Sequence, residues 1–308
     1  MRPMKPVLVL LACCAAFAGC GGKSSTVPTP PSSPNDAALV SAAVLADPTL
    51  LRDDMYENTE GSALSIGGPI VAGPRAAVRP INFYRMYTLA DRTVGVTFSD
   101  SDAAGRPRRA DVQVNRDLTG RLNIWVAPPP GEISDTTHMV HKVFRDAWAR
   151  QLRLVRVVDP TAPDSATHWV LQSASAMTVM SNPAQVAIRS VTLQAFFGNP
   201  FQLLITDPTT LMTAATRPVL PAGSYLIVRI FTGVNGQTAF LYSLDRRVNM
   251  VANGPGIYEG AMHIDPSTAS LPHRYFAVNV LSHDTLFDDA LPYDSATWII
   301  PYEVGPAR

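Results

Sequence analysis

From Ile81 onward, apolar and polar side chains alternate with a period of two, and no other feature of the sequence constrains the fold as strongly. Successive side chains of a β-strand point to opposite faces, so this alternation is typical of strands with one buried face. The clearest runs are Thr93–Phe98, Asp111–Asn115 and Leu122–Val126. Turn-forming residues separate them at Asp100–Gly105 and Leu118–Gly120. The sequence therefore predicts a meander of antiparallel strands.

The strand pattern extends toward the C-terminus. Residues Met139–Leu152 are ambiguous: their apolar side chains fit a helical face, whereas Leu152, Leu154, Arg156 and Val158 fit a strand that begins where the helix would end. Asn235-Gly236 predicts a tight hairpin, since both residue types tolerate a positive φ. Further strands are predicted at Trp169–Ser175, Val186–Ala195, Phe201–Thr206, Tyr225–Thr232, Thr238–Tyr242, Arg247–Ala252, Ile257–Ile264, Tyr275–Leu281 and Thr297–Val304.

A helical pattern precedes the strands. Residues Asp36–Asn58 place apolar side chains three and four positions apart, with Asp36 as the expected N-cap and Pro48 at the start of a second helix. Residues Gly61–Pro80 are rich in Gly, Pro and Ala and lack periodicity, which predicts a loop.

The first twenty residues have the organisation of an export signal. A charged start, Met1–Lys5, is followed by the apolar run Val7–Leu11 and by small residues ending in Ala18-Gly19-Cys20. This segment resembles the signal peptide of bacterial lipoproteins. The resemblance implies lipidation of the Cys20 thiol and removal of residues 1–19. The alternative is an ordinary cleaved secretory signal, because the apolar run is too short to remain as a membrane span.

The mature chain would be a tethered body without disulfides. Residues 20–35, rich in Gly, Ser and Pro, predict a flexible tether with a reach of roughly 20–45 Å. Cys13 and Cys14 lie in the cleaved segment, so Cys20 would be the only remaining cysteine, and its sulfur would carry the lipid. The length beyond the tether predicts two domains, residues 36–198 and 199–308, each held together by packing alone.

The element order suggests a fold class. We expect a mainly β chain, with an N-terminal α+β domain whose helices and curved antiparallel sheet resemble those of cystatin-like and nuclear-transport-factor-like domains. A C-terminal sandwich should follow, because short strands there recur at close intervals. Residues Asn253–Gly260 resemble the Asn-Gly-x-Gly-x-Tyr-x-Gly turn of bacterial immunoglobulin-like modules, although Pro255 occupies a position that is usually polar.

Composition excludes several function classes. The 25 basic and 25 acidic side chains cancel, so the chain has no long-range field for nucleic acid. Arginines between Arg106 and Arg121 and between Arg145 and Arg156 are interleaved with aspartates, which favours cross-strand ion pairs. The sequence contains no nucleophile elbow, zinc-protease or phosphate-loop motif, so a non-catalytic protein without a cofactor is favoured.

The histidine pair His138 and His141 is a weak candidate for a metal site. On a helix, both rings could face one ion with Asp135 as a neighbour, whereas on a strand they would face opposite sides. Solvated histidines are the favoured interpretation.

An acidic segment lies before the last strand. It offers four carboxylates as weak calcium ligands, on Asp284, Asp288, Asp289 and Asp294. Their spacing matches no EF-hand, so we favour a solvated loop held by the aromatic anchors Phe287 and Tyr293. Asp100 and Asp102 are explained in the same way, as turn residues.

Two functions remain as hypotheses. The first is a non-catalytic envelope lipoprotein, anchored to a membrane that is expected to be the outer one, which presents loops to another protein or to a glycan. The second is a small-ligand binder or enzyme with a cavity in the N-terminal domain. Its candidate lining residues are Tyr84, Arg85, His141 and Trp148.

Overall fold

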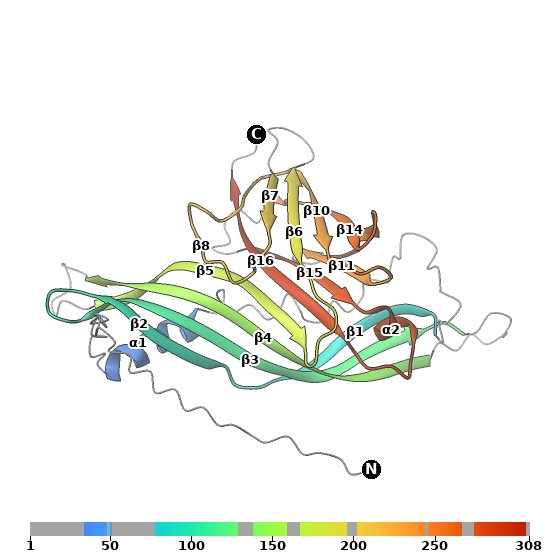
Figure 1. Ribbon diagram of the computed structural model, residues 1–308, viewed down its shortest axis with the longest axis horizontal. Helices are drawn as coiled ribbons and strands as arrows, with labels where there is room; N and C mark the ends of the chain where they lie inside the picture. Colours follow the sequence, from blue (N-terminus) through green and yellow to red (C-terminus); the bar gives the residue numbers. More distant parts are fainter. Residues whose placement is uncertain are drawn as a thin grey trace, which may run out of the picture.

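The computed structural model describes residues 34–47, 50, 78–128, 138–158, 167–195, 202–243, 246–266 and 274–305. The described part of the chain is mainly β, as the alternation predicts, and it forms two sheets with two helices (Figure 1). Within these residues, no helix has the length and apolar character needed to cross a membrane.

The first sheet is built around two long antiparallel strands, β3 (Pro107–Val126) and β4 (His138–Val158). Strands β2 (Thr93–Ser101) and β1 (Pro80–Leu89) pair with the same edge of β3, one along its first half and the other along its second. From β4 the sheet continues through β5 (Thr167–Ser181), β16 (Ser295–Gly305), β15 (Arg274–Leu281), β11 (Thr238–Ser243) and β12 (Arg246–Asn249). The short strands β8 (Met212–Thr213) and β9 (Val219–Pro221) pair with β5 and β16.

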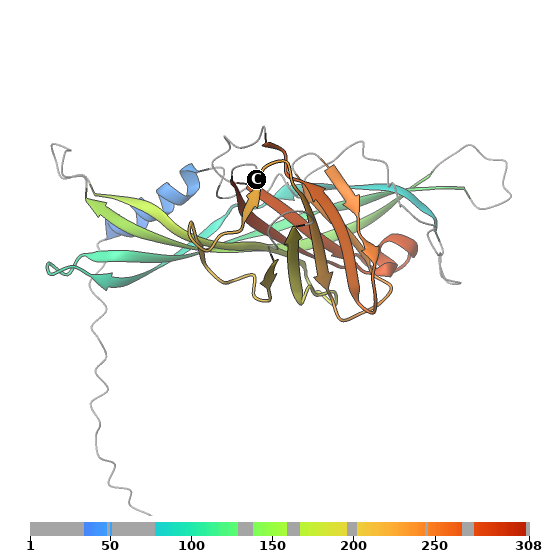
Figure 2. The ribbon, with the colours of Figure 1, turned by 90° about the horizontal axis from the view of Figure 1, so that it is seen from above.

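The second sheet is smaller and stacks on one face of the first. Its order is β13 (Val251–Ala252), β14 (Ile257–His263), β10 (Tyr225–Phe231), β6 (Ser190–Ala195) and β7 (Gln202–Ile205). Figure 1 shows β6, β7, β10 and β14 above β15 and β16, and Figure 2 gives the view from above. Leu193 and Val228 of this sheet share a buried core with Val278, Trp298 and Ile300 of the first sheet. The two sheets therefore form a sandwich.

The other face of the first sheet encloses a separate core. Helix α1 (Pro34–Ala46) buries Val40 and Val44 against it, and α2 (His283–Phe287) buries Leu286 and Phe287. In Figure 1, α1 and α2 lie near opposite ends of the long strands. We call the face toward this core the inner face and the opposite one the outer face.

A single arginine joins the two ends of the curled sheet. Arg247 on β12 donates to the Phe83 carbonyl of β1 at 2.9 Å and to Asn82 Oδ1 at 2.7 Å. Its guanidinium also lies 4.2 Å from the centre of the Phe83 ring. The curl is thus closed by a side chain from β12 at this point.

The predicted turn at Leu118–Gly120 is wrong. Strand β3 runs through it without interruption because β4 pairs with every residue there, and Leu118 is buried in the inner core. Gly120 permits this, since a Cβ at that position would collide with the Met86 carbonyl oxygen and lie 2.7 Å from the Tyr87 Cα on β1. A glycine that normally signals a turn here allows the close approach of two strands.

Other expectations have mixed outcomes. The helical alternative for Met139–Leu152 is wrong, because these residues belong to β4. Gly236 has the expected positive φ of 78°, but the predicted hairpin is wrong: the turn connects β10 of the second sheet with β11 of the first. The first part of the predicted helix is α1, but it begins at Pro34, so Asp36 lies in its first turn and is not the N-cap, and the last two residues of the predicted tether are helical. The continuation of the helix beyond residue 50 and residues 20–33, with Cys20, lie outside the described residues.

The first sheet includes strands from both sides of residue 199. Strand β5 pairs with β16 from Met177↔Ile299 to Met180↔Ala296, which joins the strands before that residue to the C-terminal ones. Strand β6 also precedes residue 199, and it lies inside the second sheet between β10 and β7. The two groups of strands are therefore connected by backbone hydrogen bonds.

Candidate functional site: a groove beside Leu211

A hollow of about 400 Å³ lies on the outer face of the first sheet, beside Leu211. Side chains on β3 alternate, so Val112 faces the inner core while its neighbours Asp111 and Gln113 line the hollow. The floor has two rungs, a rung being a row of paired residues across β2, β3 and β4: Gly95, Gln113 and Gln151, then Thr97, Asp111 and Arg153. The strands thus bring together polar groups that are distant in sequence.

The rung formed by Thr97, Asp111 and Arg153 contains an ion pair, so its net charge is zero. Arg153 Nε donates to Asp111 Oδ1 at 2.6 Å, and Ser99 Oγ donates to Asp111 Oδ2 at 3.2 Å. Both charged side chains keep over a third of their surface exposed, so solvent or a ligand can still reach them. Carboxamides on Gln113 and Gln151 supply donors and acceptors on the next rung. The floor offers dense hydrogen bonding without a net charge.

Gly95 leaves space on the first rung. A Cβ built there would meet only the Gln113 carbonyl oxygen, at 3.8 Å, which is an ordinary contact. The backbone therefore does not require glycine at this position, and a larger side chain would project into the hollow.

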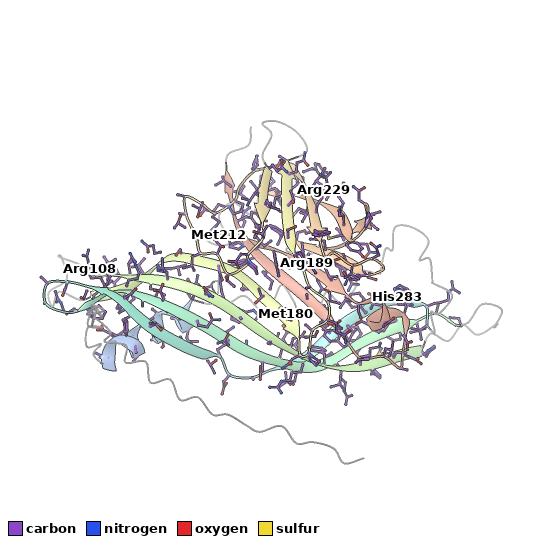
Figure 3. The ribbon with its side chains drawn as sticks, in the orientation of Figure 1. Arg108, Met180, Arg189, Met212, Arg229 and His283 are labelled. Carbon is purple, nitrogen blue, oxygen red and sulfur yellow. The ribbon has the colours of Figure 1, made fainter. Side chains whose placement is uncertain are left out.

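A second hollow of about 270 Å³ adjoins the first, with Leu211 lining both. Its walls come from β7 and from the segment leading to β8, and they are largely apolar: Leu203, Leu204, Ile205, Leu211 and Met212, with Thr206, Asp207, Thr210 and Thr216. Met212, labelled in Figure 3, pairs with Ala174 on β5 and thereby fixes the segment over the first sheet. Together, the two hollows form what we call the Leu211 groove.

A tight turn positions the Leu211 segment. The Asp207 carboxylate accepts hydrogen bonds from the Thr209 hydroxyl at 2.6 Å and from the Thr209 backbone N–H at 2.8 Å. These bonds lower the pKa of Asp207 below its usual value, with the hydroxyl as the largest cause. The turn is therefore set by local side-chain chemistry, four residues before Leu211.

The predicted acidic segment is organised by a buried lysine. Lys142 on β4 is 5% exposed and donates from Nζ to the carbonyl oxygens of Asp284 at 2.8 Å and Leu291 at 2.7 Å, and also to that of Asp288. Burial lowers the pKa of Lys142, while the neighbouring carboxylates, that of Asp288 first, oppose the shift. The anchors Phe287 and Tyr293 are buried, as expected.

The carboxylates of this segment serve the backbone. Asp294 accepts from Ser181 Oγ at 2.8 Å and from the N–H groups of Gln185 and Val186, both at 3.1 Å. Asp288 accepts from the N–H groups of Ala290 and Leu291. Asp284 lies in the first turn of α2, the helix whose first residue, His283, is labelled in Figure 3. Asp289 is exposed. Across the described ranges, no three His, Cys, Asp or Glu side chains are grouped so that they could hold a metal ion.

The histidine pair lies on a strand. Odd-numbered residues of β4 at this end face outward and even-numbered ones inward, so His138 and His141 point to opposite sides. His141 Nδ1 lies 2.6 Å from Asn123 Oδ1 across the strand pair. Asp135 lies outside the described residues.

The turn expectation is confirmed for Asp102 and the ion-pair expectation for Asp111 and Asp117, whereas Asp100 lies at the end of β2. Asp102 accepts from the Ala104 and Arg106 N–H groups, both at 2.9 Å, and the Arg106 backbone bond is the largest cause of its lowered pKa. Asp117 pairs across the strands with Arg145 at 2.7 Å, as Asp111 does with Arg153.

The inner face holds a buried polar network that sequence reasoning missed. Arg85 Nε donates to the Tyr293 hydroxyl at 3.2 Å, and that hydroxyl donates to Asp146 Oδ2 at 3.0 Å. Arg85 also donates to Asn279 Oδ1 at 3.1 Å. Of the four residues considered for a cavity, Arg85 and Trp148 are buried on the inner face. Tyr84 and His141 lie on the outer face, so the four do not converge.

Comparisons with protein-family models, with curated proteins and with solved structures find no match for this chain. Its function must therefore be inferred from its own residues.

Proposed function

We propose that this protein is a lipid-anchored, non-catalytic protein of the bacterial cell envelope that binds a neutral glycan in the Leu211 groove. The observation that carries the proposal is the pair of neutral polar rungs on the groove floor. The rungs offer two carboxamides, the Thr97 hydroxyl and an ion pair with no net charge. A ligand rich in hydroxyl groups can bind all of them, because each sugar hydroxyl both donates and accepts hydrogen bonds. The apolar walls around Leu211 suit the less polar face of a sugar ring.

The strand order supports an immunoglobulin-like sandwich as the body that carries this groove. We propose that β6, β10, β11, β12, β13, β14, β15 and β16 are its strands A, B, C, C′, D, E, F and G. The pairing orders β13-β14-β10-β6 and β12-β11-β15-β16 then correspond to the D-E-B-A and C′-C-F-G sheets of that fold. Strand β5 extends the second of these sheets beyond strand G.

The anchor is proposed from the N-terminal sequence. Cys20 follows Ala18-Gly19 and precedes a Gly-, Ser- and Pro-rich segment, an arrangement suited to lipidation and tethering. Gly21 lacks the acidic side chain that resembles a retention signal, which favours the outer membrane. The tether would leave the groove free to reach glycans within roughly 20–45 Å of the bilayer.

Calorimetric titration tests the glycan site. The full chain is titrated with the neutral oligosaccharides chitohexaose, cellohexaose and maltohexaose, and at least one should bind. Replacing both Gln113 and Gln151 with Ala removes two hydrogen-bonding groups and should weaken binding about thirtyfold. Gly95→Leu should block the hollow, because the backbone has room for a side chain that the ligand would then meet.

The matched control is Gln194→Ala, which removes a carboxamide from β6 in the second sheet. It should bind like the unaltered chain. The glycan proposal is wrong if none of the oligosaccharides binds, or if the groove variants and the control bind equally well.

A further inference from the structure

A second surface lies on the outer face of the first sheet, at the end of the long strands away from the Leu211 groove. Two rungs across β1, β3 and β4 define it: Asn82, Trp125 and Met139 form one, and Met86, Arg121 and Val143 the other, with Tyr84 and His141 on the rung between them. We call this surface the outer strip. Tyr84 and Met139 are in contact, since the Tyr84 hydroxyl lies 3.8 Å from the Met139 sulfur.

The outer strip exposes large apolar side chains. Val143 is 78% exposed, Met86 56% and Trp125 38%. Val143 and Met86 flank Arg121 on one rung, so apolar and cationic groups are interleaved. Several large apolar side chains exposed together on one face of a folded protein often mark a surface that contacts something.

The charge of these strand segments has a single sign. Residues 80–89, 118–126 and 138–145 contain no Asp or Glu, although the whole chain has equal numbers of acidic and basic residues. Arg121, Arg145 and His141 are exposed on the outer face there, whereas His138 points to the inner side. Arg145 is partly neutralised by Asp117 at the border of the strip. The surface is therefore cationic at a place where the molecule also exposes apolar and aromatic groups.

We propose that the outer strip rests on the surface of an anionic lipid bilayer. The charge complements acidic headgroups, and Trp and Tyr are the side chains that favour the boundary between headgroups and acyl chains. This inference goes beyond the glycan site and does not depend on it.

Such contact would orient the molecule. Figure 1 shows β3 and β4 along the underside of the view, with α2, β15, β16 and the second sheet above them. Since the strip points away from the inner core, a bilayer beneath it would leave the sandwich on the far side of the body. A lipid-tethered chain already close to the bilayer needs only weak additional affinity to adopt this orientation.

Tryptophan fluorescence tests the proposal at one residue. Three of the four tryptophans, Trp148, Trp169 and Trp298, are at most 7% exposed, so a lipid-borne quencher should reach only Trp125. Every protein in this experiment is the full chain with Cys20→Ser, so none carries a lipid. All of them therefore have the same N-terminal segment. The vesicles are brominated phosphatidylcholine, either alone or with about one third phosphatidylglycerol. Fluorescence should fall with the anionic vesicles and stay constant with the neutral ones.

Variants distinguish binding through the outer strip from nonspecific adsorption of the protein to the vesicles. Arg121→Gln removes one cation and should lower the vesicle partition coefficient about fivefold. Val143→Asp places a charge where acyl chains would lie and should abolish quenching. The matched control Val251→Asp alters a side chain of the second sheet that is 61% exposed, and it should partition like the parent. Arg121, Val143 and Val251 are all exposed, so the variants should fold normally. Melting temperatures equal to that of the parent would verify this.

The proposal is overturned if strip and control variants partition equally, if neutral and anionic vesicles bind alike, or if bound protein shows no quenching of Trp125. Absence of vesicle binding in all forms also overturns it, and an acidic protein surface then becomes the partner to examine. None of these results bears on oligosaccharide binding, which is measured without lipid.

Discussion

Replacing Lys142 with methionine removes the charge that holds the acidic segment in place. The ammonium group sits among three carbonyl oxygens, those of Asp284, Asp288 and Leu291, and methionine keeps nearly the same length without a donor. The change therefore isolates the hydrogen bonds from the packing of the stem.

The magnitude follows from the number of bonds and the cost of burying the charge. Hydrogen bonds from charged donors contribute about 1.5–3 kcal/mol each, so three would total roughly 4.5–9 kcal/mol. Burial of the ammonium opposes this, as its lowered pKa indicates. Asp284 and Leu291 are exposed and Asp288 is partly exposed, so water can replace some of the lost bonds. We expect a net loss of about 3 kcal/mol, which for a chain of this size lowers the melting temperature by roughly 6–12 °C.

Thermal unfolding and hydrogen exchange measure the effect. Arg145→Met on the same strand is the control, because it breaks an exposed ion pair that contributes less than about 1 kcal/mol. The Lys142 variant should also lose amide protection over residues 283–291 before the rest of the chain unfolds. The anchoring role assigned to Lys142 is refuted if the variant's free energy of unfolding lies within about 1 kcal/mol of the parent's. It is also refuted if the amide protection of residues 283–291 is unchanged.

Two further predictions follow from single contacts and one from the N-terminal sequence. In chemical unfolding, Arg247→Ala should destabilise the chain by about 2 kcal/mol and Arg247→Lys by about half as much, because lysine keeps the charge but cannot donate to two acceptors as a guanidinium does. Equal effects of the two substitutions would contradict the role of Arg247 in joining β12 to β1. The hydrogen bond from Arg229 lowers the pKa of Glu259, so its contribution exists above the unfolded pKa and disappears as the pH falls through the folded one. Glu259→Gln should accordingly cost less than about 1 kcal/mol at neutral pH and nothing in strong acid, and a constant difference across that range would argue against the pair. Labelled palmitate should enter the parent chain and not Cys20→Ser, whereas label in both would place the lipid elsewhere.

The alternation of side chains predicted most of the strands, because period two is a local property of the chain. It failed where a local signal had a non-local cause. Gly120 was interpreted as part of a turn, yet it lies in mid-strand because β1 approaches closely there. Likewise, Asn235-Gly236 does form a turn, but the sequence does not specify that it connects two different sheets.

The candidate site was less predictable than the strands. Thr97, Asp111 and Gln113 were recognisable as the polar positions of alternating strands, but the register that aligns them with Arg153 depends on pairing between distant segments. The position of Leu211 over these rungs depends on β8 joining β5. Long-range pairing of this kind leaves no signal in a single sequence, so the groove emerges only from the fold.

Photo-cross-linking inside the living cell tests the central claim, an envelope protein that holds a glycan at Leu211. Benzoylphenylalanine replaces Leu211, which lines both hollows, or Val251 on the second sheet as the control. After irradiation, the account predicts a sugar-containing adduct at position 211, recovered with the membrane fraction, and none at position 251. A protein adduct at position 211, equal sugar adducts at both positions, or recovery of the chain in the cytosol would contradict it.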